Sequence, residues 1–265
     1  MIEVGEIDST REVMRPSPKL SRLINQTHLA VVSGAAGQDR YLDLARPEIF
    51  GTAFPLAPSL GLFCTALHVY QQAAEYAASQ QNGLVVVGRI MGSPEQSIPV
   101  ADREEFPGID FVILKCPGLQ VPRLDFDFTP LDYLSEIVAC GFPFGVTLTQ
   151  GGPPVKYLRA FSGTVVTRRG LTEFPLVPPG YETSFVPPPG LSGAPLLTIR
   201  DGVAIRGVIL REHVVELGHA PERKMMLGIA LDIEELLTLN SRLAGGSVAK
   251  ILFGREPLDR GERTP

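Results

Sequence analysis

The sequence of 265 residues is long enough to bury a sizeable core and fits either one large all-β domain or two small ones. Its charged fraction of 20% and hydrophobic fraction of 44% are those of an ordinary globular protein, and its formal net charge of −5 provides no broad basic field for nucleic acid. No apolar run reaches membrane-spanning length and no secretory leader is recognisable, so we expect no membrane contact and a cytoplasmic location.

The cysteines indicate reduced thiols and no metal centre. Cys64, Cys116 and Cys140 are an odd number at scattered spacing, which is not the framework of a disulfide-bonded secreted domain. Cys64 and His68 lie four residues apart, but no second pair of ligands accompanies them, whereas structural zinc requires four. We therefore expect neither a metal nor an organic cofactor.

The first half of the chain alternates short apolar runs with turn residues. Residues 1–26 are polar and contain Pro16 and Pro18, which interrupt a helix, so we expect an N-terminal arm. Ala- and Gln-rich composition over Val69–Gln81 predicts a short helix directly after His68. Apolar, β-branched and aromatic residues bounded by Gly, Pro and Asp predict strands over 28–34, 41–46, 49–57, 60–69, 83–91 and 110–117. Residues 27–130 are therefore predicted to form a first β-barrel.

The second half repeats this style after a loop-rich connection at 117–134. Strands are predicted over 136–145, 155–169, 194–199, 203–212 and 224–231, with Asp201-Gly202 as a hairpin turn. Asp232 is placed to cap a helix over 232–244, which completes a second β-rich unit at 131–244. Residues 245–265 are expected to be a loosely held tail.

Two further segments of the second half carry expectations of their own. The adjacent basic residues Arg168-Arg169 are expected at a solvated hairpin tip. The Pro-rich segment Glu173–Pro189 is expected to be a loop, either one that shapes a neighbouring cleft or a surface loop of no consequence.

The stretch "PPPGLSGAP", Pro187 to Pro195, surrounds a single serine with stiff and turn-forming residues. It reads either as an ordinary solvated loop or as the setting of a catalytic serine. A serine hydroxyl is a poor nucleophile at neutral pH, so catalysis requires a fixed turn, backbone N–H donors and a separate base. His68, at the end of an apolar run, is a candidate base, although a lone histidine is more often a structural one. Asp110, opening the run "DFVILK", is the best-placed carboxylate to orient that histidine.

These residues carry a resemblance to a known family. "GTAF" (Gly51 to Phe54), "TALH" (Thr65 to His68), "DFVILK" (Asp110 to Lys115) and "GLSGAP" (Gly190 to Pro195) resemble, in this order, the G-T/S-G-F, T-A-A-H, D-x-A-L-L-K and G-x-S-G-G-P motifs of trypsin-like (chymotrypsin-fold) serine peptidases. "GFPFG" (Gly141 to Gly145) resembles a turn of bacterial members that include the HtrA group. The resemblance implies an all-β fold of two six-stranded antiparallel β-barrels packed side by side, with a C-terminal helix.

The resemblance also implies roles for individual residues. Ser192 would attack a peptide carbonyl, His68 would take and return the proton, and Asp110 would orient His68. The backbone N–H groups of Gly190 and Ser192 would form the oxyanion hole, for which a glycine before the serine allows the necessary turn.

Departures from the family pattern concentrate around substrate binding. Val186 occupies the position at which trypsin has its specificity aspartate. We therefore expect the substrate to carry an apolar or small residue before the cut, and not a basic one. Leu210, Arg211 and Glu212 replace the family's Ser, aromatic and Gly on the strand expected to line the cleft. Glu212 could restore a basic preference, or Arg211 could block the cleft in a resting state. Leu191 replaces the aspartate that pairs with a newly cut N-terminus, which argues against activation of that kind.

Three functions follow from these patterns. The leading one is a serine endopeptidase of restricted specificity acting on a protein or peptide, with a regulatory protein partner. An alternative is a catalytically silent trypsin-like fold that serves as a protein-binding module. A third is a β-protein whose motif matches are accidental, which predicts that His68, Asp110 and Ser192 lie far apart.

Overall fold

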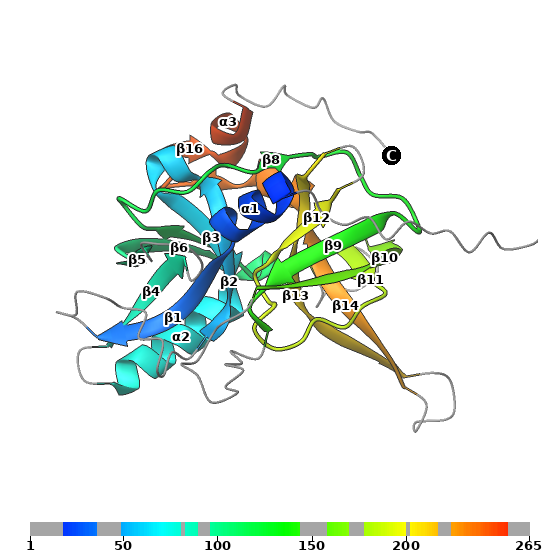
Figure 1. Ribbon diagram of the computed structural model, residues 1–265, viewed down its shortest axis with the longest axis horizontal. Coiled ribbons are helices and arrows are strands. Elements are labelled where there is room, and N and C mark those ends of the chain that lie inside the picture. Colours follow the sequence, from blue (N-terminus) through cyan, green and yellow to red (C-terminus); the bar gives the residue numbers. More distant parts are fainter. Residues whose placement is uncertain are drawn as a thin grey trace, which may run out of the picture.

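The chain folds into two β-sheet units that lie side by side (Figure 1). The computed structural model describes residues 18–35, 49–80, 83–89, 96–143, 158–169, 178–199, 202–216 and 224–253. Within this part of the chain no helix is both long enough and apolar enough to cross a membrane. The predicted strand at 41–46 falls outside the described residues.

The first sheet is antiparallel throughout, in the order β5-β4-β1-β2-β3-β7-β6. Its end strands β5 and β6 are separated in the chain by only Val100 and Ala101, so the two edges of the curved sheet are joined by a bend in the backbone. No described strand pairs with β6 on the side away from β7. The strands are β1 (Leu29–Ala35), β2 (Ile49–Ala57), β3 (Leu62–Ala66), β4 (Gly83–Arg89), β5 (Gln96–Pro99), β6 (Asp102–Phe106) and β7 (Phe111–Lys115).

Helix α2 (Leu67–Ser79) packs against β1 and β4 and begins directly after β3. Its buried residues recur at spacings of three and four, which is the period of a helix with one apolar face. They are Leu67, Val69, Tyr70, Ala73 and Ala77. The expected strand over 60–69 therefore ends at Ala66, and His68 belongs to the first turn of the helix.

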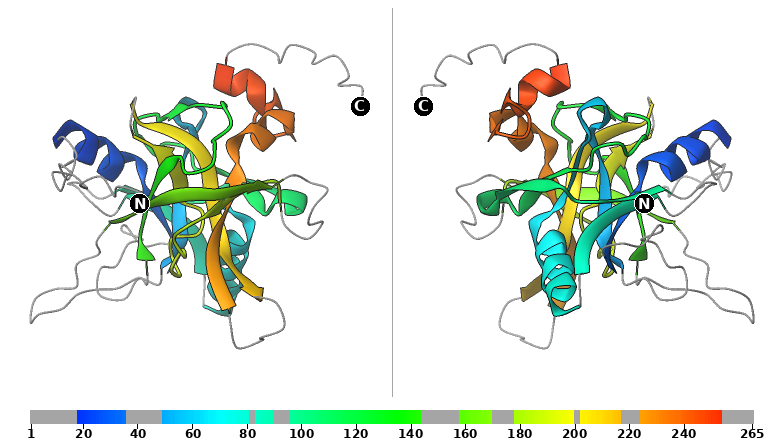
Figure 2. Two further views of the ribbon diagram at one scale, coloured as in Figure 1. Left: turned by 90° about the vertical axis from the view of Figure 1, so that its right-hand side faces the viewer. Right: turned by 90° about the vertical axis from the view of Figure 1, so that its left-hand side faces the viewer.

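The second sheet closes on itself. Its order is β12-β9-β10-β11-β14-β13, and the pairing of β12 with β13 completes a six-stranded barrel, to which β8 adds in parallel alongside β13. The β13–β14 ribbon projects away from the barrel, at the opposite end of the molecule from the helix α3 (Val248–Phe253) (Figures 1 and 2). The strands are β8 (Asp125–Phe126), β9 (Glu136–Gly141), β10 (Arg159–Arg169), β11 (Gly180–Thr183), β12 (Pro195–Thr198), β13 (Ala204–Glu216) and β14 (Lys224–Asp232).

The C-terminal elements return to the first sheet. After the 3-10 helix η4 (Ile233–Thr238) come the short paired strands β15 (Asn240–Ser241) and β16 (Gly246–Ser247) and the helix α3 (Val248–Phe253). Asp232 caps η4 as predicted, since its Oδ1 accepts from the Glu234 amide at 3.0 Å. The C-terminal helix is therefore confirmed, but it lies at 248–253 inside the expected loose tail, and the helix predicted over 232–244 is a 3-10 turn and a hairpin.

Three local expectations were wrong. Helix α1 (Pro18–Thr27) occupies part of the expected N-terminal arm, because proline is tolerated in the first turn of a helix and here begins one. Strand β11 lies within the Pro-rich segment expected to be a loop. Arg168 and Arg169 do not sit at a solvated tip: Arg169 is buried and paired with Glu182, and the Arg168 guanidinium bridges to Asp232 at 3.2 Å.

The remaining predicted strands are confirmed to within a few residues, and the run 49–57 matches β2 at both ends. Most large buried side chains of the first unit pack in one apolar cluster with residues of β13 and β14 such as Val208 and Leu231, while a second cluster, which includes the alternate residues Ile209 and Ala230, fills the barrel of the second unit. The all-β, chymotrypsin-like architecture predicted from the motifs is confirmed, although only the second unit is a closed six-stranded barrel and the first is a half-barrel sheet of seven strands.

Candidate active site

His68 and Asp110 meet where two turns of the first unit converge. His68 is the second residue of α2, and Asp110 follows the 3-10 turn η2 (Pro107–Ile109) at the start of β7. Asp110 adopts a left-handed backbone, with φ of 51°, a conformation that Asp tolerates better than most residues. The Leu67 amide donates to the Asp110 carbonyl at 3.0 Å, which ties the end of β3 to this turn.

The Asp110 carboxylate holds His68 by two contacts. His68 Nδ1 lies 2.8 Å from Asp110 Oδ2, and the His68 amide donates to Asp110 Oδ1 at 3.0 Å. Ala66, the N-cap residue of α2, has no side-chain acceptor, so Asp110 supplies the cap from a neighbouring turn. Because an ionised carboxylate only accepts hydrogen bonds, Nδ1 carries the proton of a neutral His68 and Nε2 is left as an acceptor.

Ser192 lies in a turn held by two glycines. Gly190 and Gly193 have φ of 92° and 81°, which an L side chain rarely adopts. The Leu191 amide donates to the Pro188 carbonyl and the Ala194 amide to the Leu191 carbonyl, each at 3.0 Å. The rigidity expected of this stretch is thus present as consecutive tight turns around a half-buried Ser192.

Strand β2 fixes the Ser192 turn against the first unit. The Thr52 amide donates to the Ser192 carbonyl at 2.9 Å, and Thr52 Oγ1 donates to the Gly190 carbonyl at 2.9 Å. A Cβ built on Gly51 would lie 2.7 Å from the Ser192 carbonyl oxygen and 2.5 Å from Cγ1 of Val69, the residue after His68. The Ser192 turn and the first turn of α2 therefore contact the same glycine. This contact argues against the hypothesis that the motif matches are accidental.

The amides expected to form an oxyanion hole are available. Among the described residues, neither the Gly190 nor the Ser192 amide donates a hydrogen bond to the protein. The Gly190 carbonyl is held by Thr52 Oγ1, and this contact also fixes the orientation of the peptide that follows. Sequence reasoning assigned no role to Thr52, although Thr52 lies within "GTAF", one of the four resembling motifs.

The four residues expected to bind substrate lie in different environments. Leu210 is completely buried, Val186 is half-buried, and Arg211 and Glu212 are exposed on β13. The register of β13 against β14 shifts between Ile209 and Arg211. This shift marks a β-bulge, which changes the direction of the strand where it passes the Ser192 turn. Leu210 therefore belongs to the core, whereas Arg211 and Glu212 face the surface.

Gly228 is a further residue of this region that sequence reasoning missed. It pairs with Glu212 across β13 and β14. A Cβ built on Gly228 would lie 2.3 Å from Thr183 Oγ1, 2.5 Å from the Phe185 carbonyl and 2.9 Å from Pro187 Cδ. The space between these segments is therefore narrow, and the glycine within the apolar run "LGIAL" was the signal of a close approach.

The three cysteine thiols and a cavity in the second barrel take no part in the contacts described above. Burial raises the pKa of Cys116 and of Cys140 to about 12 and raises that of Cys64, so all three thiols stay protonated. Within the described ranges no three metal-ligating side chains gather. A cavity of about 540 Å³ at the far end of the second barrel is lined by Asp125, Asp127, Glu136 and Arg206, among others, and does not include Ser192.

Comparison with solved structures identifies the fold. No family model and no curated protein matches the sequence. The active form of the Rv3671c protease from M. tuberculosis superposes with a TM-score of 0.52 at 18% identity, covering 95% of this chain and 94% of that one. The apo protease domain of MamO from Magnetospirillum magneticum gives 0.51 at 13% identity, over 80% and 95%.

A third structure, the HtrA-type protease AlgW with a tripeptide, has a TM-score of 0.55 at 14% identity, covering 88% of this chain and 62% of that one. At sequence identities this low, the superpositions show a common fold but not a common activity or substrate. The chain has the trypsin-like fold of HtrA-type serine protease domains.

Proposed function

We propose that the protein is a serine endopeptidase that uses His68, Asp110 and Ser192 through an acyl-enzyme intermediate. The observation that carries this proposal is the hydrogen bond of 2.8 Å between His68 Nδ1 and Asp110 Oδ2, next to a Ser192 turn anchored on Thr52. It supports an imidazole with a fixed tautomer and an open Nε2, which is what activation of a serine hydroxyl requires.

The reaction divides into two balanced steps. As Ser192 Oγ attacks the peptide carbonyl, His68 Nε2 takes its proton and then gives it to the leaving amine, so that the C–N bond breaks and an ester forms. Water then attacks the ester with His68 again as base, which releases the acid and restores Ser192. Asp110 stabilises the transient imidazolium, and no metal or cofactor enters the reaction.

The oxyanion that develops in each step needs donors in a fixed arrangement. The amides of Gly190 and Ser192 fit this role, because the positive φ of Gly190 and the contact of its carbonyl with Thr52 restrain the turn. Removal of one such donor in related chemistry costs about 10²–10³ in rate.

Substrate preference follows from the residues beside Ser192. The narrow space at Gly228, next to Val186, favours a small apolar residue before the cut. Arg211 and Glu212 are exposed on β13 and act at the rim, where Glu212 favours a basic neighbour in the substrate. Leu210 shapes the cleft only from beneath, since its side chain is buried.

We further propose a cytoplasmic location and restraint by a protein partner. The location is supported by Cys64, Cys116 and Cys140, all of which are buried free thiols. The partner is inferred from the need to restrain proteolysis inside a cell. Full activity of the purified chain on many unfolded proteins would refute such restraint.

Labelling with a serine-directed fluorophosphonate probe tests the proposal. We expect labelling of the wild type and its loss in both Ser192→Ala and His68→Ala, with Ser162→Ala, an exposed serine on β10, as the matched control. A folded wild type that takes up no probe and cleaves no peptide would instead favour a catalytically silent binding module.

A further inference from the structure

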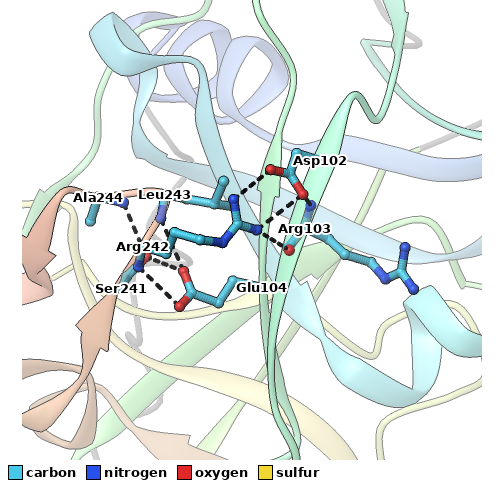
Figure 3. Close-up of polar contacts among 7 residues, drawn as sticks. All are labelled: Asp102, Arg103, Glu104, Ser241, Arg242, Leu243 and Ala244. Carbon is cyan, nitrogen blue, oxygen red and sulfur yellow. Dashed lines mark hydrogen bonds and ion pairs between the residues drawn. The ribbon is translucent and has the colours of Figure 1, made fainter.

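The free edge of β6 is held by the chain's last described hairpin. Residues 240–247, which we call the C-terminal clasp, comprise β15, β16 and the turn between them, and Figure 3 shows this turn against β6. Glu104 receives three hydrogen bonds: from Ser241 Oγ at 2.6 Å, from the Arg242 amide at 3.0 Å and from the Leu243 amide at 3.1 Å. One side chain of β6 thereby accepts hydrogen bonds from three donors of a turn whose Ser241 lies 137 residues away in sequence.

A second side chain extends the same contact. The Arg242 guanidinium donates to Asp102 Oδ2 at 2.7 Å and Oδ1 at 3.1 Å, and to the Arg103 carbonyl of β6 at 3.1 Å (Figure 3). Paired contacts of a planar guanidinium with a carboxylate fix direction as well as distance. The C-terminal clasp therefore occupies the side of β6 that no described strand covers.

The charges of this contact are matched. Burial acts to raise the pKa of Glu104, but the hydrogen bonds from Ser241, Arg242 and Leu243 together outweigh it and bring that pKa below its ordinary value. The hydrogen bonds from Arg242 and from the Arg103 amide lower the pKa of Asp102. Both carboxylates are thus ionised at neutral pH and bind the C-terminal clasp in that form.

Strand β6 leads to the candidate site along two routes. The Arg103 guanidinium lies 5.0 Å from the ring centroid of Tyr70, which is buried in α2 two residues after His68. The strand also pairs with β7 as far as Phe106 opposite Phe111, and the turn that joins them ends at Asp110. One short strand therefore contacts both the helix that carries His68 and the turn that carries Asp110.

We propose that the C-terminal clasp acts through β6 as the positioning element of the His68–Asp110 pair, with Glu104 as its anchor. Asp110 is held in a left-handed backbone, which costs about 1–3 kcal/mol and persists only where the surrounding structure imposes it. Without the C-terminal clasp, β6 loses the partner on its outer side, and the β6–β7 turn gains freedom to relax. The catalytic meaning of this positioning rests on the proposed function, whereas the hydrogen bond itself does not.

The test measures that hydrogen bond directly. In proton NMR, the Nδ1–H of a histidine bonded to a carboxylate appears far downfield, and His68→Ala assigns the signal. We expect the signal in the wild type and in Glu136→Ala, an exposed glutamate on β9, and expect it broadened or lost in Glu104→Ala. Arg242→Ala, which removes a side chain that is 62% exposed, should show the same change to a smaller degree.

A second readout separates positioning from general stability. Probe labelling of Ser192 should slow about tenfold in Glu104→Ala at a temperature well below its unfolding midpoint, and Glu104→Gln, which keeps one acceptor, should recover part of the rate. An unchanged NMR signal in both Glu104→Ala and Arg242→Ala would overturn the inference, as would the absence of the signal from the wild type. A signal that depends on Glu104 in a protein that takes up no probe would uphold the positioning and defeat only the proposed peptidase activity.

Discussion

Replacement of Gly51 by alanine provides a direct test of how closely the Ser192 turn must approach α2. The added Cβ would lie 2.7 Å from the Ser192 carbonyl oxygen, about 0.7 Å short of ordinary contact at 3.4 Å, and 2.5 Å from Val69 Cγ1. The Val69 side chain can rotate, but the carbonyl belongs to the backbone that carries Ser192. The Ser192 turn must therefore move away from Gly51 by several tenths of an ångström.

The size of the effect follows from that displacement. A misplacement of about 1 Å between reacting groups costs roughly 10²-fold in rate, so we expect Gly51→Ala to slow probe labelling by about 10- to 100-fold. Overpacking should lower the free energy of unfolding by about 1–3 kcal/mol, as measured by urea denaturation. The stability loss and the rate loss are separable, because labelling is measured where the variant remains folded.

Gly108→Ala is the matched control, since a Cβ at Gly108 would meet nothing within 4 Å. It should leave both labelling and stability near the wild-type values. Labelling of Gly51→Ala at the wild-type rate would refute the close approach of the Ser192 turn to α2, and with it the geometry on which the proposed mechanism depends.

Three further changes have defined outcomes. Asp110→Asn should keep the fold but slow labelling by about 10⁴-fold, the loss known for this change in the Ser-His-Asp template, because an amide favours the wrong tautomer of its histidine; a loss below tenfold would count against the triad. Tyr181→Phe should cost about 1–3 kcal/mol in urea unfolding, because the Tyr181 hydroxyl donates to Asp232 at 2.8 Å and accepts from the Leu131 amide at 3.2 Å. Burial lowers the pKa of His28 from 6.5 to about 4, so the folded state favours the neutral imidazole. The contribution of His28 to the free energy of unfolding is therefore complete above pH 6.5, and roughly 3 kcal/mol of it is lost as the pH falls toward 4. His28→Gln should flatten that slope, and an equally steep slope in the variant would assign it to other groups.

The sequence predicted well where the signal was local. The run Ile49–Ala57 is rich in apolar and aromatic residues and is bounded by turn residues, and its predicted bounds match those of β2. The four motifs also identified the fold, because each motif encodes a backbone shape, such as the positive φ at Gly190 and Gly193. Such shapes depend on few neighbours in the chain and can be read from a short segment.

Prediction failed where long-range contacts determine the structure. Strand β6 has the sequence "DREEF", which no pattern of apolar residues marks as a strand, and its Glu104 is explained only by a hairpin far along the chain. Strand β11 lies in a Pro-rich segment and was not recognised as a strand. Its Gly180 packs against the Ala230 carbonyl of β14, a contact that the local sequence does not reveal. Arg169 looked solvated because its partner, Glu182, lies on that same unrecognised strand.

The contact between Glu104 and Ser241 spans 137 residues and therefore bears on how the chain is made. Synthesis proceeds from the N-terminus, so β6 leaves the ribosome long before the segment that covers its edge. A product that stopped just before Asn240 would contain His68, Asp110 and Ser192 yet lack the contact that orients the first two. Synthesis of residues 240–247 would then itself be the step that confers activity, and fragments that end before these residues would be poor peptidases.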